Sequence, residues 1–429
     1  MIFLVILLAL IALILTGLPV FAALGIFGGA LMAIDEGSIA ALGEIVFGKL
    51  NTYLLVAIPL FTLMAHFMIK GRIVDDLYGT ANTLLRHLPG GLGVATVVAC
   101  TIFAAISGSS VATALTIGAV AIPQMRHYGY TDRAAYGVVG AGGTLGILIP
   151  PSRPMILYAV IADASIGQLF MAGVVPWRVL ATLFSIYCMV ANTSAGRTKA
   201  ERPERASLPE MLQALRRSFW ALTLPVFVLG GMYFGVFTAT EAAAAGALAA
   251  LAIAVLVYRS LGLEEIWASA LDATRTSAML FMILAAAAVF SHALTKMRIP
   301  QEIVALVTSY GLGPIGFLLA VMLLVLVLGM FLETISIILI TTPIVLPVLH
   351  ALGINPIWYG VLLMINLELA LVTPPVGMNL FTIKAIAKAP IEPIIRGVFP
   401  YTLILLLGLF LVLAFPGLAL WLPSTMFAR

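Results

Sequence analysis

Residues 142–153 of the chain read GGTLGILIPPSR, and residues 371–379 read LVTPPVGMN. Each stretch places two consecutive prolines inside an otherwise apolar run. A proline lacks an amide donor and clashes with the preceding helical turn, so an α-helix does not pass through such a pair intact. Each stretch therefore predicts a helix broken in two, with freed carbonyls before the break and the amino end of a second half-helix after it.

The composition around these breaks is that of a membrane protein. Of the 429 residues, 62% are hydrophobic and 9% charged, against about 25% charged in soluble domains. Apolar runs that cross much or all of a hydrocarbon layer about 30 Å thick recur from Ile2–Leu15 to Leu403–Leu420. The first run has no basic flank or cleavage site, so we expect a permanent helix. The sequence predicts an all-α polytopic membrane protein embedded in a lipid bilayer.

Charge and cysteine usage exclude other classes. The net charge is +4, but the basic residues are spread over short loops, so no nucleic-acid partner is expected. Cys100 and Cys188 lie in apolar stretches without metal-ligand spacing, which favours packed thiols. The five histidines form no catalytic or metal cluster in the sequence. We therefore do not expect an enzyme.

Basic residues mark one loop as cytoplasmic. The most polar stretch, Asn192–Ser218, divides the chain almost in half, and an excess of lysine and arginine in a short loop is typical of the cytoplasmic side. The basic residues in it are Arg197, Lys199, Arg202, Arg205, Arg216 and Arg217. Tracing the apolar runs from this loop leaves the C-terminus outside. We expect the N-terminus inside.

Two pairs of short apolar arms predict re-entrant hairpins. Gly91–Ile106 and Val111–Ile122 lie between basic loops, and each arm is short of the roughly 20 residues that a crossing needs. This hairpin therefore enters and leaves on the cytoplasmic side. Ile315–Leu328 and Ile337–Leu349 form a second pair, and the loop after them lacks lysine and arginine, which favours the external side.

One offset relates the two halves. Pro150-Pro151 and Pro374-Pro375 differ by 374 − 150 = 224 residues, and the same offset relates Ser109-Ser110 to Glu333-Thr334. With opposite loop charges this indicates an inverted repeat, although chance matches are the alternative in a chain with 38 glycines and 23 prolines. The expected division is helices and an arm in 1–90, hairpin and broken helix in 91–175, scaffold in 176–313, second hairpin and broken helix in 314–396, and a last scaffold helix in 397–429.

The hairpin tips carry the candidate ion chemistry. The first tip reads ISGSSV at residues 106–111, and its unpaired backbone and hydroxyl oxygens can hold a cation, although a small-residue packing patch is the alternative. The second reads GMFLET at 329–334 and puts the carboxylate of Glu333 at the matching place. Glu368 is the other acid deep in an apolar run; it could bind a proton or cation, pair with a base, or cap a helix. We expect two unequal half-sites, one hydroxyl-rich and one carboxylate-bearing.

The residues after the breaks suit an anionic substrate. Carbonyls before each proline pair can bind Na⁺, while the following half-helix, with Ser152 or Asn379, favours an anion. Arg153 can bind a substrate carboxylate in bidentate fashion. It could equally reach a membrane interface or pair with Asp163.

Four motifs in order, Ser107–Ser110, Gly143–Ser152, Gly235–Glu241 and Thr373–Gly377, make the chain resemble the large membrane subunit of tripartite ATP-independent periplasmic (TRAP) transporters. The likeness covers essentially the whole chain. It implies a Na⁺-driven secondary transporter of the bacterial inner membrane that takes an organic acid, such as a C4-dicarboxylate, from a periplasmic binding protein beside a small membrane subunit. It also implies an elevator fold of the ion transporter superfamily, in which hairpins and broken helices slide as one block.

The resemblance places Na⁺ sites at the two tips and breaks, and substrate between them. The expected cation ligands are Ser107, Gly108, Ser109, Ser110, Gly143, Gly146, Ile149, Gly329, Glu333, Thr334, Thr373 and Gly377. The expected substrate residues are Ser107, Ser152, Arg153, Glu333 and Asn379. Arg153 stands where many relatives are expected to have an aliphatic residue, and Glu333 where aspartate is also common. No extra helices precede Ile2 or fill the central loop, so we expect the small subunit to be a separate chain.

Three other functions compete with this one. An ion channel could use the same broken helices, and a carboxylate/Na⁺ symporter of related fold outside the TRAP family would share the hairpins. One hairpin on each side of the membrane favours alternating access over a channel. An intramembrane serine protease ranks last, because no histidine lies at a depth comparable to Ser107–Ser110 to act as its base.

Overall fold

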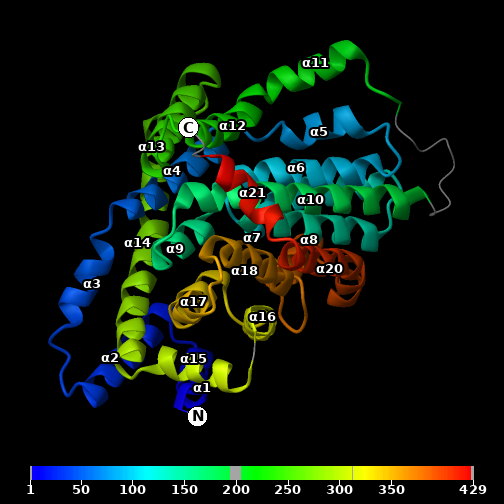
Figure 1. Cartoon of the computed structure of the whole chain (residues 1–429). Helices are drawn as coiled ribbons and strands as arrows, with labels where there is room; N and C mark the ends of the chain where they lie inside the picture. Colours follow the sequence, from blue (N-terminus) through cyan, green and yellow to red (C-terminus); the bar gives the residue numbers. More distant parts are fainter. Residues whose placement is uncertain (1, 194–203, 312, 427–429) are drawn as a thin grey trace.

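The computed structural model describes residues 2–193, 204–311 and 313–426, and within these ranges the secondary structure is entirely helical (Figure 1). Seven of the described helices are long and apolar enough to cross a membrane, and seven further apolar helices have 10–17 residues. This confirms the all-α polytopic class.

The first repeat unit follows the predicted punctuation. Its helices are α6 (Gly91–Ser107), α7 (Ser110–His127), α8 (Asp132–Leu148) and α9 (Arg153–Ile161). Gly108 takes a left-handed φ of 56° and ends α6, and the Ser109 side chain caps α7 by accepting from the amide of Ala112. After the proline pair, Ser152 caps α9 in the same way. Helix α8 is therefore broken where residues 149–152 leave the helical ladder.

The second unit repeats this order at the expected offset. Its helices are α16 (Pro314–Gly329), α17 (Thr334–Ala351), α18 (Pro356–Leu371) and α19 (Met378–Ala387). Adding 224 to the first residues of α7 and α8 gives 334 and 356, the first residues of α17 and α18. The bonds Pro150-Pro151 and Pro374-Pro375 are both cis. The element bounds confirm the repeat.

The long helix α10 (Ile166–Thr193) shows that the two hairpins enter from opposite ends. The base of the first hairpin packs at the far end of α10, where a Cβ on Gly93 would lie 3.2 Å from that of Cys188. Helix α18, which begins five residues after the end of the second hairpin, packs near the start of α10, where a Cβ on Gly360 would lie 2.9 Å from Leu169. The orientation is therefore inverted.

A second group of helices lies along one side of the molecule, and we refer to them as the scaffold helices (Figure 1). These are α1 (Ile2–Leu15), α2 (Val20–Asp35), α3 (Leu42–Leu50), η1 (Tyr53–Val56), α4 (Ala57–Lys70), α12 (Phe219–Tyr233), α13 (Ala239–Ala252), η3 (Ile253–Val257) and α14 (Leu263–Lys296). Helices α2 and α14 run in the same direction, because Gly25 lies beside Ala286 and Gly28 beside Phe290. Gly28 has no room for a side chain, since a Cβ would lie 2.8 Å from the Phe290 backbone.

The remaining helices depart from one expectation. They are α5 (Leu77–Leu85), α11 (Leu208–Arg217), α15 (Ile299–Ser309), α20 (Ile391–Ala414) and α21 (Gly417–Thr425). The stretch treated as one cytoplasmic loop contains α11, which a capping box of Ser207 and Glu210 begins; Arg197, Lys199 and Arg202 lie outside the described residues. Helix α10, described above, continues through Pro176.

Candidate functional site

Both hairpin tips line one cavity of about 130 Å³. The first unit contributes its tip, Ile147 before the break and Arg153 after it, and the second contributes its tip and Met378. Helix α14 of the scaffold closes the cavity with Thr276, Met279 and Leu280. The site therefore lies where two repeats meet a third element. The predicted residues in its lining are Gly108, Ser109, Ser110, Arg153, Glu333 and Thr334.

The first tip is pressed against the break of α8. A Cβ on Gly108 would lie 2.7 Å from the carbonyl oxygen of Pro151, and one on Gly146 would lie 2.6 Å from the backbone between Ser109 and Ser110. Real Cβ atoms do not approach backbone this closely, so glycine is required at both positions. The first tip therefore lies in contact with the break of α8, as the sequence predicted.

The carboxylate of Glu368 joins this tip to the second repeat. Oε1 accepts a hydrogen bond of 2.6 Å from the amide of Ile147, and the Ser110 hydroxyl donates to Oε1 and Oε2 at 3.1 and 3.0 Å. Glu368 is 1% exposed, and none of the described basic side chains lies within 4.0 Å of it. The ion-pair alternative for Glu368 is therefore wrong. Its role as a link between tip and break could not be read from the sequence, whose one signal was an acid within an apolar run.

The second tip packs on its own broken helix. A Cβ on Gly329 would lie 2.5 Å from that of Ala370. Gly377 has a left-handed φ of 52°, and the carbonyl oxygens of Leu371 and Thr373 both lie 3.1 Å from the position of its Cβ. The Thr373 hydroxyl donates to the carbonyl of Leu369 at 2.6 Å. Carbonyl oxygens thus converge at this break, and they are hard ligands suited to Na⁺.

Arg153 and Glu333 bring opposite charges to the same cavity. Arg153 forms none of the salt bridges found among the described residues. Its guanidinium is therefore available to a ligand, and Glu333, rather than Asp163, is the acid that shares its cavity.

Other predicted site residues are buried behind the cavity wall. Ser107 is hydrogen-bonded to the hydroxyl of Thr113 at 3.1 Å, and Ser152 accepts from the amide of Met155 at 3.5 Å. Asn379 is fully buried, and neither of its amide atoms has a hydrogen-bond partner among the described residues. An unpaired buried polar group costs about 1–3 kcal/mol. Both amide atoms of Asn379 are therefore free to hydrogen-bond with a ligand.

Two predicted cation ligands have packing roles in the structure. A Cβ on Gly143 would lie 2.8 Å from that of Ala114, so this glycine lets α7 and α8 approach. Ile149 ends α8 in an extended conformation and is 2% exposed. Its carbonyl lies at the break of α8, and its side chain is buried in the core.

An apolar helical chain whose inverted repeats close two hairpins on a charged cavity defines a membrane transport protein. The family model described as "Tripartite ATP-independent periplasmic transporter, DctM component" matches residues 7–418. The chain belongs to this family of TRAP transporter large permeases. The resemblance in the sequence is thereby confirmed, and the relatives are transporter permeases, not enzymes.

Three curated relatives show the range of the family. The chain is 40% identical to the C4-dicarboxylate TRAP transporter large permease protein DctM of Pseudomonas aeruginosa, over 94% of this chain and 93% of that protein. It is 34% identical to the ectoine permease TeaC of Halomonas elongata, over 97% and 98%. It is 33% identical to the sialic acid permease SiaM of Vibrio cholerae, over 88% of each chain. Within this family of secondary transporters of organic acids, the substrate differs from member to member.

A solved structure supports the fold alone. The YdaH transporter of Alcanivorax borkumensis aligns with a TM-score of 0.67 at 13% identity, over 92% of this chain and 96% of that one.

TRAP large permeases work with a substrate-binding protein and usually a small membrane subunit. One relative is a fusion, the isethionate permease DctMQ of Oleidesulfovibrio alaskensis, of which this chain spans 64% at 35% identity.

Proposed function

We propose that this chain carries out Na⁺-coupled uptake of a carboxylate-bearing organic acid that a periplasmic binding protein delivers. The observation that carries the proposal is the cavity in which both tips meet Arg153. A guanidinium that is not engaged in a salt bridge binds a carboxylate with two parallel hydrogen bonds. A C4-dicarboxylate is the first candidate, since a relative named for it is 40% identical.

The opposite charge of Glu333 adds a condition on the substrate. A second substrate carboxylate beside Glu333 would be repelled unless a cation lies between them. Na⁺ held by Glu333 and the carbonyls around Gly377 supplies that cation, so substrate and ion bind together. A Na⁺ ion placed in this way would account both for substrate binding and for the coupling of uptake to Na⁺.

A first Na⁺ site is proposed at the other tip. Its ligands are the oxygens of Ser107–Ser110 and the carbonyls at the end of α8, and Glu368 supplies the nearby negative charge. A buried carboxylate without a basic partner is costly. A bound cation offsets that cost, which is the physical reason for placing it there.

We propose an elevator motion of the two repeat units against the scaffold. The cavity has one wall from α14 and the others from the repeats, so sliding the repeats would carry the bound substrate past a fixed wall. The sequence placed residues 397–429, and with them most of α20, in the scaffold. We group α20 with the moving repeat units instead, because Gly397 packs on Arg133 and Gly137 of α8. The small subunit is proposed to be a separate chain that steadies the scaffold in the bacterial inner membrane.

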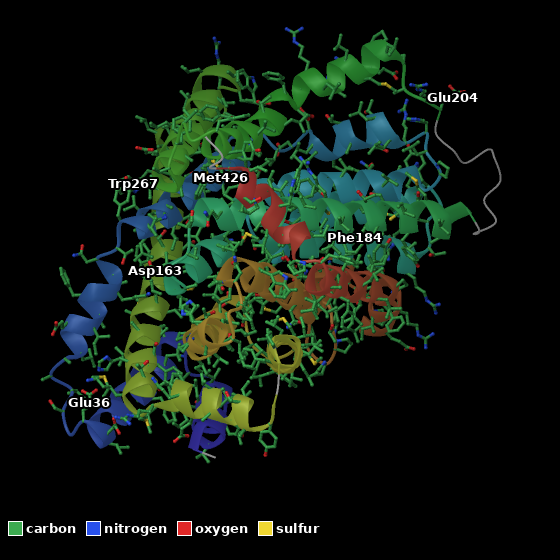
Figure 2. All side chains as sticks on the ribbon, viewed as in Figure 1. Glu36, Asp163, Phe184, Glu204, Trp267 and Met426 are labelled. Atoms are coloured by element: carbon green, nitrogen blue, oxygen red, sulfur yellow. The ribbon has the colours of Figure 1, made fainter. Side chains whose placement is uncertain are left out.

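The packing leads us to reverse the expected side of the N-terminus. If the loop before α11 is cytoplasmic, α12 runs outward, α13 inward and α14 outward. Because α2 runs parallel to α14, it also ends outside, where Glu36 pairs with His292 at 3.0 Å. Figure 2 shows Glu36 and Glu204 at opposite edges of the molecule, as this topology requires. Helix α1 then runs inward from an external N-terminus, and the C-terminus stays external.

Reconstitution tests the proposal. The chain is placed in proteoliposomes with its small subunit, and uptake of radiolabelled succinate is measured with and without an inward Na⁺ gradient and the binding protein. Accumulation against the gradient only when both are present supports the proposal. Downhill ion current without either would favour a channel and refute it.

A further inference from the structure

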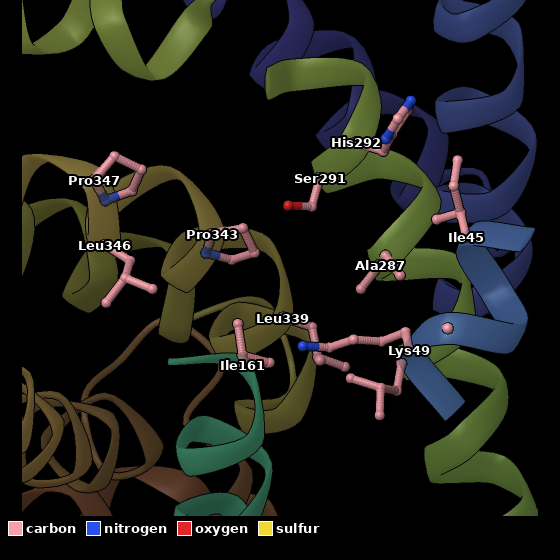
Figure 3. Close-up of a pocket in the computed structure, with 13 residues that line it drawn as sticks. Ile45, Lys49, Ile161, Ala287, Ser291, His292, Leu339, Pro343, Leu346 and Pro347 are labelled. Atoms are coloured by element: carbon pink, nitrogen blue, oxygen red, sulfur yellow. The ribbon is translucent and has the colours of Figure 1, made fainter. Parts of the chain in front are cut away.

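A second cavity, of about 410 Å³, lies between the scaffold and the repeat units (Figure 3). The scaffold contributes Lys49 of α3 and Ser291 of α14, and the repeat units contribute Ile161 at the end of α9 and Pro343 of α17. In the topology proposed above, these segments lie in the outer half of the molecule. The cavity is therefore distinct from the site at the hairpin tips.

Two polar groups point into this cavity. Figure 3 shows the Lys49 ammonium and the Ser291 hydroxyl directed toward its centre, whereas the His292 ring turns away from it. Lys49 Nζ donates to the carbonyl of Val160 at 3.1 Å. An ammonium has three donors, and that carbonyl is the one acceptor with which the described residues engage it. Two donors remain for a ligand.

The charges around Lys49 leave the cavity positive. Burial lowers the pKa of Lys49, and the carboxylate of Asp163 acts more weakly in the opposite direction. The residues that line the cavity include no acid, and Glu36 is engaged by the lining residue His292 at 3.0 Å. The Lys49 ammonium is partly desolvated, and the carboxylate of Asp163 does not balance its charge. Such an ammonium attracts an anion.

We infer that this cavity is an outer anion site in which Lys49 and Ser291 bind the carboxylate of a small organic acid. Its volume lies within the usual range of about 300–1,000 Å³ for small-molecule sites. Leu339, Pro343 and Ala287 provide apolar walls for the carbon skeleton. The identity of the anion rests on the proposed function, whereas the anion preference rests on this geometry. The site would hold the acid between the binding protein and the hairpin tips.

Cysteine labelling of Ser291→Cys tests the site without transport. The native thiols of Cys100 and Cys188 are fully buried. The labelling rate is measured in detergent with the anionic reagent sulfonatoethyl methanethiosulfonate and with neutral methyl methanethiosulfonate. Adding Lys49→Met should lower the labelling rate with the anionic reagent about tenfold and change the rate with the neutral reagent less than about twofold. Lys49→Arg keeps the charge, so its labelling rate with the anionic reagent should lie within about threefold of the rate with Lys49 present.

Succinate provides the second measurement. It should slow labelling of the Lys49 protein and have no effect on the Lys49→Met protein. Equal changes for both reagents, or no change, would show that Lys49 only packs and would overturn the inference. If the wild-type chain fails to accumulate succinate, the proposed function fails while the reagent ratio still reports the anion site. Normal uptake with an unchanged ratio refutes the anion site alone.

Discussion

Replacing Glu368 by leucine or by glutamine tests the contact that joins the two repeats. Both changes remove the carboxylate charge, so the difference between them isolates the hydrogen bonds. Glutamine keeps an oxygen that can accept from the amide of Ile147, which donates at 2.6 Å in the wild type. Leucine leaves that buried amide without an acceptor. The leucine variant should therefore be the less stable of the two.

The magnitude follows from which groups lose partners. An unsatisfied buried amide costs about 1–3 kcal/mol. The Ser110 hydroxyl loses less, because the carbonyl of Thr144 lies 3.4 Å away and can accept from it. The leucine variant is expected to be about 2–4 kcal/mol less stable than the glutamine variant. At roughly 2 °C per kcal/mol for a large chain, it should melt about 4–8 °C lower.

Thermal unfolding in detergent, followed by tryptophan fluorescence, measures this difference. Glu392 provides the matched control, because it pairs with Arg396 on the exposed surface of α20. Its leucine and glutamine variants should melt within about 1 °C of each other. Equal melting temperatures for the two Glu368 variants would show that the carboxylate does not hold tip and break together.

Gly146→Ala should abolish succinate uptake, because its Cβ would lie 2.6 Å from the backbone of the first tip. Gly230→Ala is the control and should transport normally, because no atom lies within 4 Å of its Cβ position. Equal uptake by both variants would contradict the close packing. Arg153→Met should raise the succinate concentration for half-maximal uptake about tenfold or more, since it removes a charged, bidentate contact; an unchanged value would remove Arg153 from the substrate site. Cys100 and Cys188 should react with maleimide only after unfolding, as followed by mass spectrometry, because both are fully buried.

The sequence predicted those parts of the fold that local chemistry decides. A proline pair breaks a helix wherever it stands, and Gly108 can end α6 with its positive φ, so hairpins and breaks were found near their true bounds. The proposed division between scaffold and moving block rests on packing between distant helices, which the charge pattern does not report. The outer cavity around Lys49 was missed for this reason. The contact between Glu368 and Ile147 spans 221 residues, and the sequence showed a buried acid but not its partner.

The repeat relation explains why Glu368 reaches the opposite tip. Subtracting 224 from 368 gives 144, and Ser110 contacts both positions, the carbonyl of Thr144 and the carboxylate of Glu368. Equivalent levels of α8 and α18 therefore meet beside one tip, as expected near the axis that relates two repeats. The second tip has its own acid, Glu333, whereas the first tip has hydroxyls alone in its sequence. The expectation of one hydroxyl-rich and one carboxylate-bearing half-site stays a prediction, and the structure adds to it an acid of the second repeat, Glu368, beside the first tip. Each tip has one carboxylate within reach, and displacing the first tip would break hydrogen bonds between repeats that displacing the second would leave intact.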